Sequence, residues 1–492
     1  MTQRATGVRI VASFPLAGAL VAGCATVGPN YARPEMSPPA VYRDAGDAQA
    51  RETLADIPWW QVFQDEALQA LIRDAIAHNY DLRVAIARVQ EARALARVAR
   101  SFLYPDVGIS AFSGVNQASR NSQPPIVTED DEDRTFNNTS LTATMAWELD
   151  LFGRLRRDSE AAFARYLASE EGRRAVLITL VSDVATAYFQ LRELDLQREV
   201  ALRTLTLNDQ TVDYYRTRLA GGVSNRLELD SAVANRSLTA ASVPDIERQV
   251  AILENAISVL VGRAPGAVVR GQTLEEQALP PNIPVGVPAV LLERRPDVVQ
   301  AEQLLVASNA DVGAAKALFY PTISLTGSVG AISGDLSNLL KGDSFIWSLG
   351  ANLFQPLFNA GRIRGNYEAA RARFDQAMAE YQQTAINAYR EVSDSLIAIQ
   401  KLAAIRVEQQ AGVVALRDAS TLSRERYDIG LSSYIEILLA DQQLFQLELE
   451  LARTRGDEMR ALAQLYRALG GGWQPEPTTA PPPPPPTTPT AP

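Results

Sequence analysis

The chain repeats itself, and this repeat limits its possible folds more than any other feature. Four segments recur in the same order, the first at an offset of 216 residues and the others at about 208 residues. The matching pairs are Tyr104–Ser110 with Tyr320–Thr326, Leu151–Arg154 with Leu357–Arg362, Arg218–Leu229 with Arg426–Ile437, and Leu260–Gly262 with Ala468–Gly470. Matches in one order predict two similar halves, residues 66–262 and 296–470.

Each half contains two stretches in which apolar and polar residues alternate. They cover about residues 106–116 and 141–150 in the first half, and 322–329 and 345–353 in the second. A period of two over about ten residues predicts strands with one apolar and one polar face. The pattern is typical of outer-membrane barrel strands, whose apolar side chains face lipid. An ordinary half-buried sheet has the same pattern, so the alternation alone leaves both open.

The remainder of each half has a helical composition. Long stretches lack proline, and apolar residues between Tyr367 and Ala388 step by three and four, as in a coiled coil. We expect long helices over residues 154–220 and 361–428, each roughly 100 Å long at 1.5 Å per residue.

Shorter helices are expected on either side of the long ones. Their ranges are 66–103, 223–262, 296–319 and 432–469. Summed lengths suggest that 223–262 stacks on 296–319 and that 432–469 stacks on 66–103, which would give each half one continuous and one interrupted rod. The rods would join at turns near Gly222 and Gly430.

Four strands cannot close a membrane barrel, because about eight are the minimum. Open strand edges cannot lie in lipid, where backbone groups find no partner. We therefore expect several chains to contribute strands to one closed barrel.

The amino terminus predicts the compartment. Residues 1–23 are typical of a secretory signal, with Arg4 and Arg9 ahead of a short apolar stretch that ends at Ala22. Small residues then lead to Cys24, as in a bacterial lipobox, which predicts an acylated cysteine. The alternative is a plain signal peptide with a chance cysteine. Ala25 follows, and the absence of Asp there favours the outer membrane.

Composition excludes several classes of function. The chain has one cysteine and one histidine, His78, which excludes an intrachain disulfide and a Cys/His zinc cluster. The formal net charge of -10 argues against nucleic acid as a partner. Because no nucleophile arrangement, metal cluster or phosphate loop is evident, we expect neither an enzyme nor a cofactor.

Several motifs together resemble one family. They are Cys24 with Val27–Tyr31 and Pro34, Trp59–Trp60, Asn79–Leu82, Trp147–Arg154, Arg294–Asp297, Tyr320–Pro321 and Leu469–Trp473. In this order and spacing they resemble the TolC-like outer membrane factors, particularly the NodT-type lipoproteins of resistance-nodulation-division efflux systems. The matches span almost the whole chain after the signal.

The resemblance implies a mainly α fold with a small β part. A long antiparallel α-helical barrel in the periplasm would continue into a transmembrane β-barrel closed by trimerisation, with four strands per protomer. The expected organisation is a signal peptide at 1–23, a lipidated N-terminal segment at 24–65, a first structural repeat at 66–262, an equatorial linker at 263–295, a second structural repeat at 296–470 and a Pro-rich disordered tail at 471–492.

The resemblance also implies a function and partners. The protein would be a passive exit duct for drugs or other small toxic compounds, docked to a periplasmic adaptor and an inner-membrane pump, with its barrel in outer-membrane lipid. Two alternatives stay open: the duct of a type I protein secretion system, and a structural envelope lipoprotein. The strand pairs argue against the second, because a spacer needs no barrel. We expect the hairpin loops 117–138 and 332–344 to face the cell exterior.

The turns are the candidate sites for adaptor docking. Gly222 and Gly430 tolerate a tight backbone, and Ser224 and Ser432 are expected to cap the returning helices.

The candidate gate comprises Arg226, Tyr427, Glu436 and Asp441. Relatives often read Leu-Asp-Ala-Gln after the second turn, but Leu439 occupies the aspartate position here. Glu436 and Asp441 are the nearby acids, and Arg226 is the candidate partner that would let an acidic ring close. The alternative is that both acids are solvated on an outer face.

Overall fold

The computed structural model describes residues 26–39, 53–117, 135–277 and 288–472. Cys24, residues 118–134 of the first hairpin loop and residues 473–492 of the Pro-rich tail lie outside the described residues. The chain forms two compact units, each built from both halves of the sequence. The first unit comprises Met1–Glu35, Val89–Ser169 and Ala301–Tyr381, and the second comprises Met36–Arg88, Glu170–Gln300 and Gln382–Pro492.

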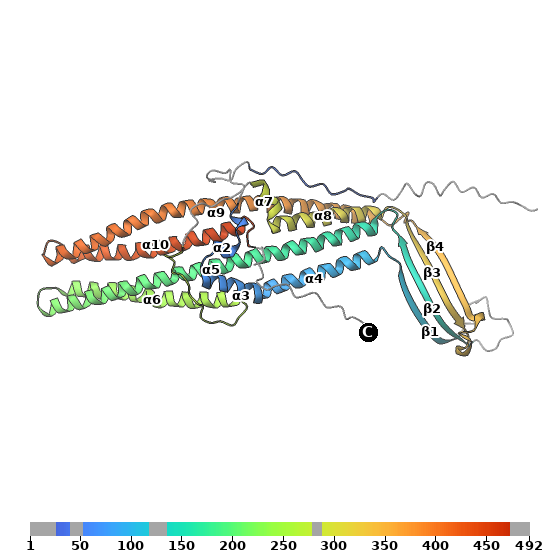
Figure 1. The fold of residues 1–492 in the computed structure, drawn as a ribbon, viewed down its shortest axis with the longest axis horizontal. Helices are drawn as coiled ribbons and strands as arrows, with labels where there is room; N and C mark the ends of the chain where they lie inside the picture. The colour runs from blue at the N-terminus through green and yellow to red at the C-terminus, as the bar shows by residue number, and fades with distance from the viewer. Residues whose placement is uncertain (1–25, 40–52, 118–134, 278–287, 473–492) are drawn as a thin grey trace, which may run out of the picture. The chain divides into compact units, whose positions relative to one another are not determined.

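The first unit contains a four-stranded antiparallel sheet in the order β1-β2-β3-β4 (Figure 1). The strands are β1 (Asp106–Gln117), β2 (Thr135–Leu149), β3 (Thr322–Ser333) and β4 (Phe345–Phe354). Both expected hairpins form, and β2 pairs with β3, so the sheet joins the two halves of the sequence. In the described chain β1 and β4 are the two edges.

The register gives the sheet one apolar and one polar face. Ile109, Ala143, Val329 and Trp347 form one row across all four strands, and Ile109 and Trp347 are 79% and 72% exposed. The neighbouring row, on the opposite face, is polar: it contains Thr144, Ser328 and Ser348, and the hydroxyls of the two serines lie 2.7 Å apart. The predicted alternation is confirmed, and large side chains of the apolar face are exposed.

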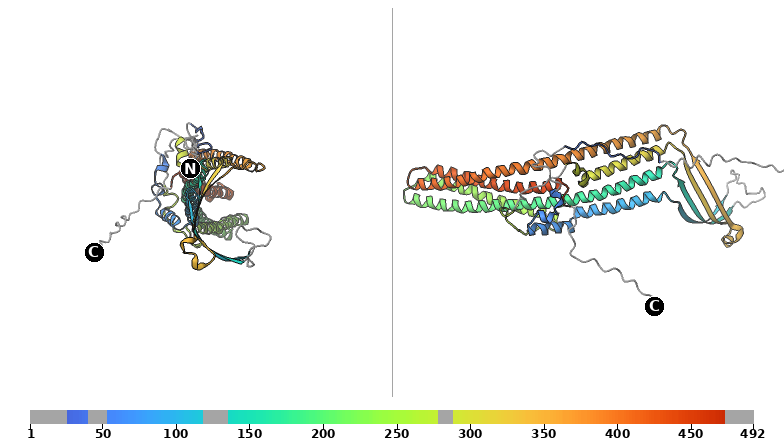
Figure 2. Two further views of the ribbon diagram at one scale, coloured as in Figure 1. Left: turned by 90° about the vertical axis from the view of Figure 1, so that its right-hand side faces the viewer. Right: turned by 45° about the horizontal axis from the view of Figure 1, so that its top comes forward.

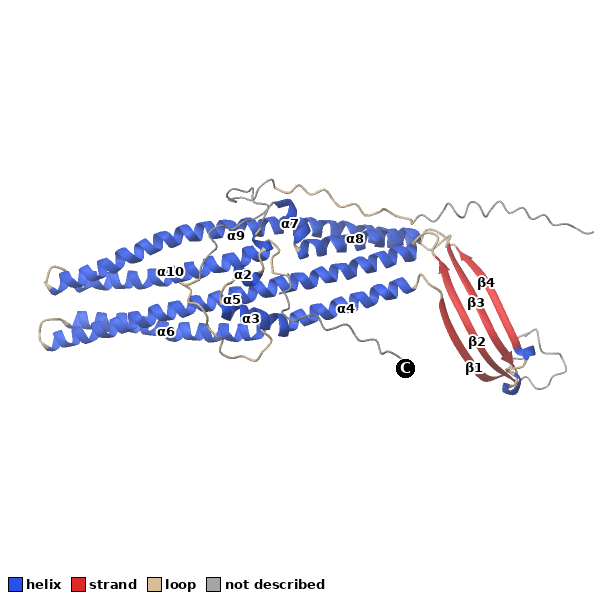
Figure 3. Ribbon diagram, in the orientation of Figure 1, coloured by secondary structure: helices blue, strands red, loops and turns tan. Residues whose placement is uncertain are grey.

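The remaining elements are helical (Figure 3). The main helices are α3 (Glu66–His78), α4 (Tyr80–Ser101), α5 (Arg154–Ala220), α6 (Arg226–Leu260), α8 (Pro296–Ala317), α9 (Arg362–Asp428) and α10 (Tyr434–Ala468). The short ones are η2 (Leu54–Asp56), α2 (Trp59–Val62), α7 (Pro288–Arg294), η3 (Leu336–Asn338) and η4 (Gly342–Ser344).

Corresponding helices of the two halves have equal lengths. The helices α5 and α9 have 67 residues each, α6 and α10 have 35, and α4 and α8 have 22. The helix expected over 66–103 is broken at Asn79, whose extended backbone ends α3. One stretch of α5 is long and apolar enough to span a membrane, but half of it is buried inside the protein.

The short helices stack differently from the prediction. The side chain of Asn79, at the start of α4, donates a 2.9 Å hydrogen bond to the carbonyl of Leu260, the last residue of α6. The side chain of Arg295, at the start of α8, donates a 3.1 Å bond to the carbonyl of Ala468, the last residue of α10. Thus α6 meets α4 and α10 meets α8, and the predicted pairing was wrong. Since both stacking schemes give similar total lengths, length could not distinguish them.

The segment that begins at Thr26 is fixed against the first unit by close backbone contacts. The Val27 N–H donates a 3.0 Å hydrogen bond to the Phe152 carbonyl. A Cβ added at Gly28 would lie 2.5 Å from the Gly313 Cα, so the two glycines permit a contact that no larger residue fits. Asn30 accepts a 2.8 Å hydrogen bond from Arg157 of α5. The Val-Gly-Pro-Asn motif is therefore a docking sequence for the N-terminal segment.

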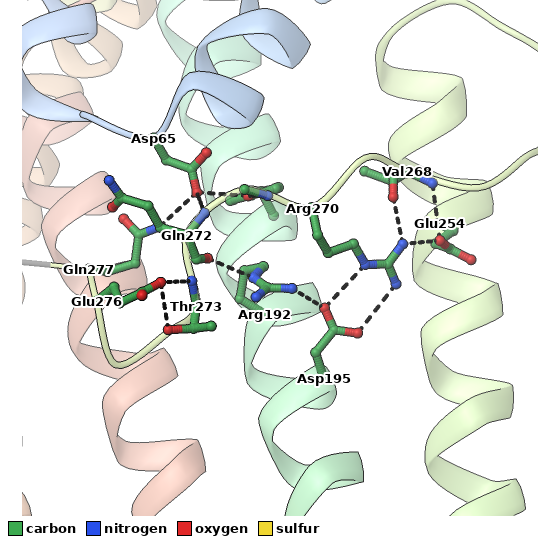
Figure 4. A network of polar contacts seen from close by, with 12 residues as sticks. Asp65, Arg192, Asp195, Glu254, Val268, Arg270, Gln272, Thr273, Glu276 and Gln277 are labelled. Atoms are coloured by element: carbon green, nitrogen blue, oxygen red, sulfur yellow. Dashed lines mark hydrogen bonds and ion pairs between the residues drawn. The ribbon is translucent and has the colours of Figure 1, made fainter.

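The linker after α6 is held in the second unit by one buried carboxylate (Figure 4). Asp65 caps α3 by accepting from the Ala67 and Leu68 N–H groups. Its other oxygen accepts from the Tyr188 hydroxyl at 2.8 Å, the Gln272 N–H at 2.9 Å and the Gln277 side chain at 2.8 Å. This Asp65 hub joins α3, α5 and the linker.

Arginines complete the attachment of the linker (Figure 4). Arg192 on α5 donates to the Gln272 carbonyl at 2.9 Å. Arg270 forms ion pairs with Asp195 of α5 and Glu254 of α6. Side chains thus supply partners for residues 263–277, which form no helix or strand.

The two helical hairpins, α5/α6 and α9/α10, lie side by side within the second unit (Figures 1 and 2). Their contacts create the site described next.

Candidate functional site at the helical turns

The turn between α5 and α6 closes by a Schellman motif. Gly222 adopts a φ of 71°, and its N–H donates to the Leu219 carbonyl at 3.0 Å. The Val223 N–H donates to the Arg218 carbonyl, also at 3.0 Å. These two bonds satisfy carbonyls that the helix end would leave free.

The turn between α9 and α10 repeats this geometry. Gly430 has a φ of 77°, and its N–H donates to the Tyr427 carbonyl at 2.9 Å, while the Leu431 N–H donates to the Arg426 carbonyl at 2.8 Å. A Cβ on Gly222 or Gly430 would meet nothing within 4 Å. The positive φ, and not a lack of space, therefore requires glycine at both turns.

The predicted caps are corrected by one residue. Asn225, not Ser224, is the N-cap of α6, and it forms a capping box with Glu228. The Ser224 hydroxyl instead donates to the Glu228 carboxylate. The turn needs one more extended residue before the helix, and Asn225 provides it with φ -113° and ψ 164°.

At the second turn the N-cap of α10 is Ser433, whose side chain makes no cap hydrogen bond. Ser432 donates to the Ser423 carbonyl at 3.3 Å. The first turn therefore has a side-chain cap that the second lacks.

An arginine supports each turn from the last turn of its helix. Arg218 donates to the Val223 carbonyl at 3.5 Å and Arg426 donates to the Leu431 carbonyl at 3.3 Å. Both matching segments of the sequence repeat begin with these arginines, so the signal was present in the sequence although the role was not assigned.

An aromatic cluster lies beneath the turns. Tyr215 of α5 contacts Tyr434 of α10 and Tyr427 of α9, with ring centroids 4.5 Å and 5.8 Å apart. Burial, together with the charge of Asp441, raises the pKa of Tyr434 to about 12. The predicted gate residue Tyr427 thus belongs to a cluster that joins both hairpins.

A polar contact also joins the two hairpins here. The Tyr214 hydroxyl of α5 donates a 2.7 Å hydrogen bond to Asp428 of α9 and accepts a 2.8 Å bond from Arg218. The Arg218 guanidinium lies over the rings of Tyr214 and Tyr427, 5.4 Å and 5.3 Å from their centroids. Burial and the bond to Asp428 raise the pKa of Tyr214. We call Tyr214, Arg218 and Asp428 the tip latch.

A cavity of about 290 Å³ adjoins the tip latch. Residues of α5, α9 and α10 line it, among them Tyr214, Tyr215, Tyr427, Arg424 and Asp428.

The predicted gate acids lie in different environments. The Asp441 carboxylate is 14% exposed and is held by Arg424 at 2.5 Å and by the Ser420 hydroxyl. Glu436 is exposed. Arg226 is 86% exposed and pairs with Asp230 on its own helix at 3.4 Å. Within one protomer the structure therefore brings Asp441 to Arg424, and it does not bring Arg226 to either acid.

Sequence reasoning missed Tyr214, Arg218, Arg424 and Asp428. Each lies within the last three turns of a long helix, just before a predicted glycine turn. Tyr214 and Asp428 are not equivalent positions of the repeat, so the sequence alone did not pair them.

Comparison with known proteins identifies the family. The family described as outer membrane efflux protein matches residues 71–263 and 287–471, one block in each half. The cation efflux system protein CusC of Escherichia coli O6:H1 is 34% identical over 463 residues, covering 92% of this chain and 96% of that protein. The solvent efflux pump outer membrane protein SrpC of Pseudomonas putida is 33% identical over 467 residues, covering 94% and 98%.

Solved structures agree. The outer-membrane channel OprN superposes with a TM-score of 0.85 at 32% identity, covering 92% of this chain and all of that one. The Neisseria gonorrhoeae MtrE outer membrane channel gives a TM-score of 0.82 at 28% identity, covering 92% and 99%. The chain therefore belongs to the outer membrane efflux protein family, and it is an outer-membrane channel subunit of an efflux system.

Proposed function

We propose that three copies of this chain form a passive exit duct for drugs or other small toxic compounds. The observation that carries the trimer is the open four-stranded sheet. The edges β1 and β4 leave backbone groups that lipid cannot satisfy, and the exposed apolar face fits a lipid surface. Three protomers would supply twelve strands, within the range of closed membrane barrels.

Light scattering of the purified protein in detergent tests this assembly. A particle with three protein chains is expected. A monodisperse monomer that still conducts ions would contradict the proposal, because an open sheet cannot line a pore through lipid.

The turns are proposed as the docking site for a periplasmic adaptor and a resistance-nodulation-division pump. Apolar side chains surround them: Val223, Leu227, Ile429 and Leu431 are each at least 64% exposed. Exposed apolar residues gathered at one place mark interaction sites. Replacement of Leu227 and Leu431 by Ser should abolish adaptor crosslinking while leaving trimers intact. Adaptor crosslinking at the parent level would place docking elsewhere.

The gate is proposed to lie at the same end of the hairpins. The tip latch and Tyr427 tie α5 to α9, and Asp441 is neutralised by Arg424. Glu436, Arg226 and Asp441 could meet their counterparts around a threefold axis. Opening would then require the tip latch to break. Single-channel recordings of Asp428→Asn in planar bilayers should show higher resting conductance, and unchanged conductance would move the gate away from this contact.

The efflux role in the outer membrane is common to the family, and lipid anchoring at Cys24 remains a proposal. Val27 is docked against Phe152, beside the end of β2. Cys24 lies three positions before Val27 in the sequence, a reach of about 10 Å when extended. This reach supports an anchor beside the strand ends.

The loops 117–138 and 332–344 are proposed to face the exterior. Antibody access to tags in loop 332–344 on intact cells tests this topology.

A further inference from the structure

We infer that Glu448 is a positioning residue for the gate. Its buried carboxylate binds one arginine from each hairpin and holds the hairpins together at this point, so that only the part between Glu448 and the turns can separate. This inference rests on the gate proposed at the turns.

The geometry at Glu448 is a three-helix tie. Glu448 lies on α10 with its side chain 9% exposed. Arg203 of α5 donates to Oε2 at 2.8 Å, and Arg417 of α9 donates to Oε1 at 2.7 Å. Each oxygen therefore accepts one arginine. One bond lies within the hairpin α9/α10, and the other crosses to α5.

From Glu193 to the end of α5, polar side-chain contacts of the described residues tie α5 to the other hairpin at three levels. Glu193 accepts from Arg460 of α10 near the Asp65 hub. Arg203 follows ten residues later and Tyr214 eleven residues after that. At 1.5 Å per residue the levels are roughly 15 Å apart. The tie at Glu448 is thus the middle one, between the linker attachment and the tip latch.

The tie at Glu448 is also the last charged one before the turns. In the part of the chain that the structure describes, no ion pair between the two hairpins lies closer to the turns. The intervening contact between Gln442 and Asn235, 3.1 Å, is neutral. From Glu448 to the turns, only neutral contacts and the tip latch oppose separation.

Besides the tie at Glu448, the pair of Arg460 with Glu193 also crosses between the hairpins, whereas the next two ion pairs each act within a single hairpin. In α5/α6, Arg198 pairs with Glu247 and both side chains are nearly half exposed. In α9/α10, Arg406 pairs with Glu458, which is 3% exposed. Among the described carboxylates of the hairpins, Glu448 accepts an arginine from both. It therefore couples the internal register of α9/α10 to the position of α5.

Mutation can separate the bond from Glu448 to α5 from its bond within the hairpin α9/α10. Removal of Arg203 leaves Glu448 paired with Arg417, so no buried carboxylate is left without a partner. Removal of Arg417 leaves the pair with Arg203. The two arginines are similarly exposed, 49% and 59%, so they form a matched pair of sites.

The experiment records single channels of the purified full-length protein in planar bilayers. Arg203→Gln should raise the resting open probability about fivefold, the effect of roughly 1 kcal/mol on a two-state equilibrium. Arg417→Gln should leave it unchanged, and Arg203→Lys should restore most of the closed state. The thermal unfolding midpoints of the two Gln variants should agree, because each loses one arginine from the same carboxylate.

The outcomes separate the inference from the gate beneath it. Equal rises in Arg203→Gln and Arg417→Gln would reduce Glu448 to a structural role and overturn the inference. If the resting open probability rises in Asp428→Asn but not in Arg203→Gln, the inference is overturned and the gate proposed at the turns is retained. A rise in Arg203→Gln alone would remove the tip latch as the gate and keep the tie at Glu448. No change in either would overturn both.

Discussion

Tyr214 on α5 donates a 2.7 Å hydrogen bond to Asp428 on α9, and this bond joins the last turns of two helices from different halves of the sequence. Arg218 holds the Tyr214 hydroxyl from the other side at 2.8 Å. The phenol therefore donates to a carboxylate and accepts from a guanidinium. Both are charge-assisted bonds, which are stronger than neutral ones.

Tyr214→Phe should raise the resting conductance of the channel without unfolding it. The substitution keeps the ring that Arg218 covers and removes only the hydroxyl, which leaves Asp428 without its donor on α5. A bond of this kind contributes about 1.5 kcal/mol. Single-channel recording measures the effect. The control is Arg216→Gln, which removes an exposed ion pair with Asp213 on the same helix; if both variants leak equally, the tip latch has no special role.

Alkaline pH should open the same contact. The pKa of Tyr214 is raised above its ordinary value of 10.0, first by burial and then by the bond to Asp428. Because the folded pKa is the higher one, the stabilising contribution is complete below pH 10 and is lost as pH rises through the folded pKa. Conductance should therefore increase above pH 10 in the parent, and this increase should be smaller in Tyr214→Phe. An identical pH profile in both proteins would assign the transition to other groups, such as Tyr434 with its pKa of about 12.

Alanine should lower the stability of the protein at the turn glycines and raise it at a glycine inside a helix. Gly222→Ala and Gly430→Ala force a side chain into positive φ, at a cost of roughly 1–2 kcal/mol each. Gly365 lies inside α9, and a Cβ there would also meet nothing within 4 Å. Gly365→Ala should therefore stabilise by about 0.5–1 kcal/mol. Circular dichroism during heating compares the midpoints, and a rise for the turn variants would show that these turns are not conformationally constrained.

The sequence predicted the elements of this fold well because the repeat supplied two independent readings of each. The bounds of α5 were predicted without error, and those of α9 to within one residue. Alternation placed Ile109 and Trp347 on one face, as the register confirms. Periodicity and glycine positions are local signals, so one chain was enough to read them.

Contacts between helices were not readable in the same way. The stacking of α6 on α4 depends on where Asn79 lies, and composition does not encode that. Arg424 rather than Arg226 neutralises Asp441, because α9 and α10 run antiparallel and place residues 424 and 441 at one level. The sequence showed suitable charges near the turns, but only the packing selected the partners.

Acylation of Cys24 should be required for incorporation of labelled palmitate. It is the only cysteine of the chain, so Cys24→Ser leaves no other thiol for a lipid. Metabolic labelling of cells that express each protein measures this, with equal protein amounts verified by immunoblot. Equal labelling of parent and variant would refute the lipobox prediction.

Gly271→Ala should destabilise the protein by breaking the Asp65 hub. A Cβ at Gly271 would lie 2.0 Å from Oδ1 of Asp65, and that oxygen cannot move away because it caps α3. The linker would have to shift instead, so the Gln272 N–H would lose its 2.9 Å bond to the carboxylate. An unsatisfied buried group of this kind costs roughly 1–3 kcal/mol. Gly266→Ala in the same linker is the control, because its Cβ would meet no atom closer than 3.9 Å. In Gly271→Ala, the linker should be cleaved faster in limited proteolysis and the thermal unfolding midpoint should fall. Gly266→Ala should change neither measurement. If the two variants behave alike, the linker is not held by Asp65.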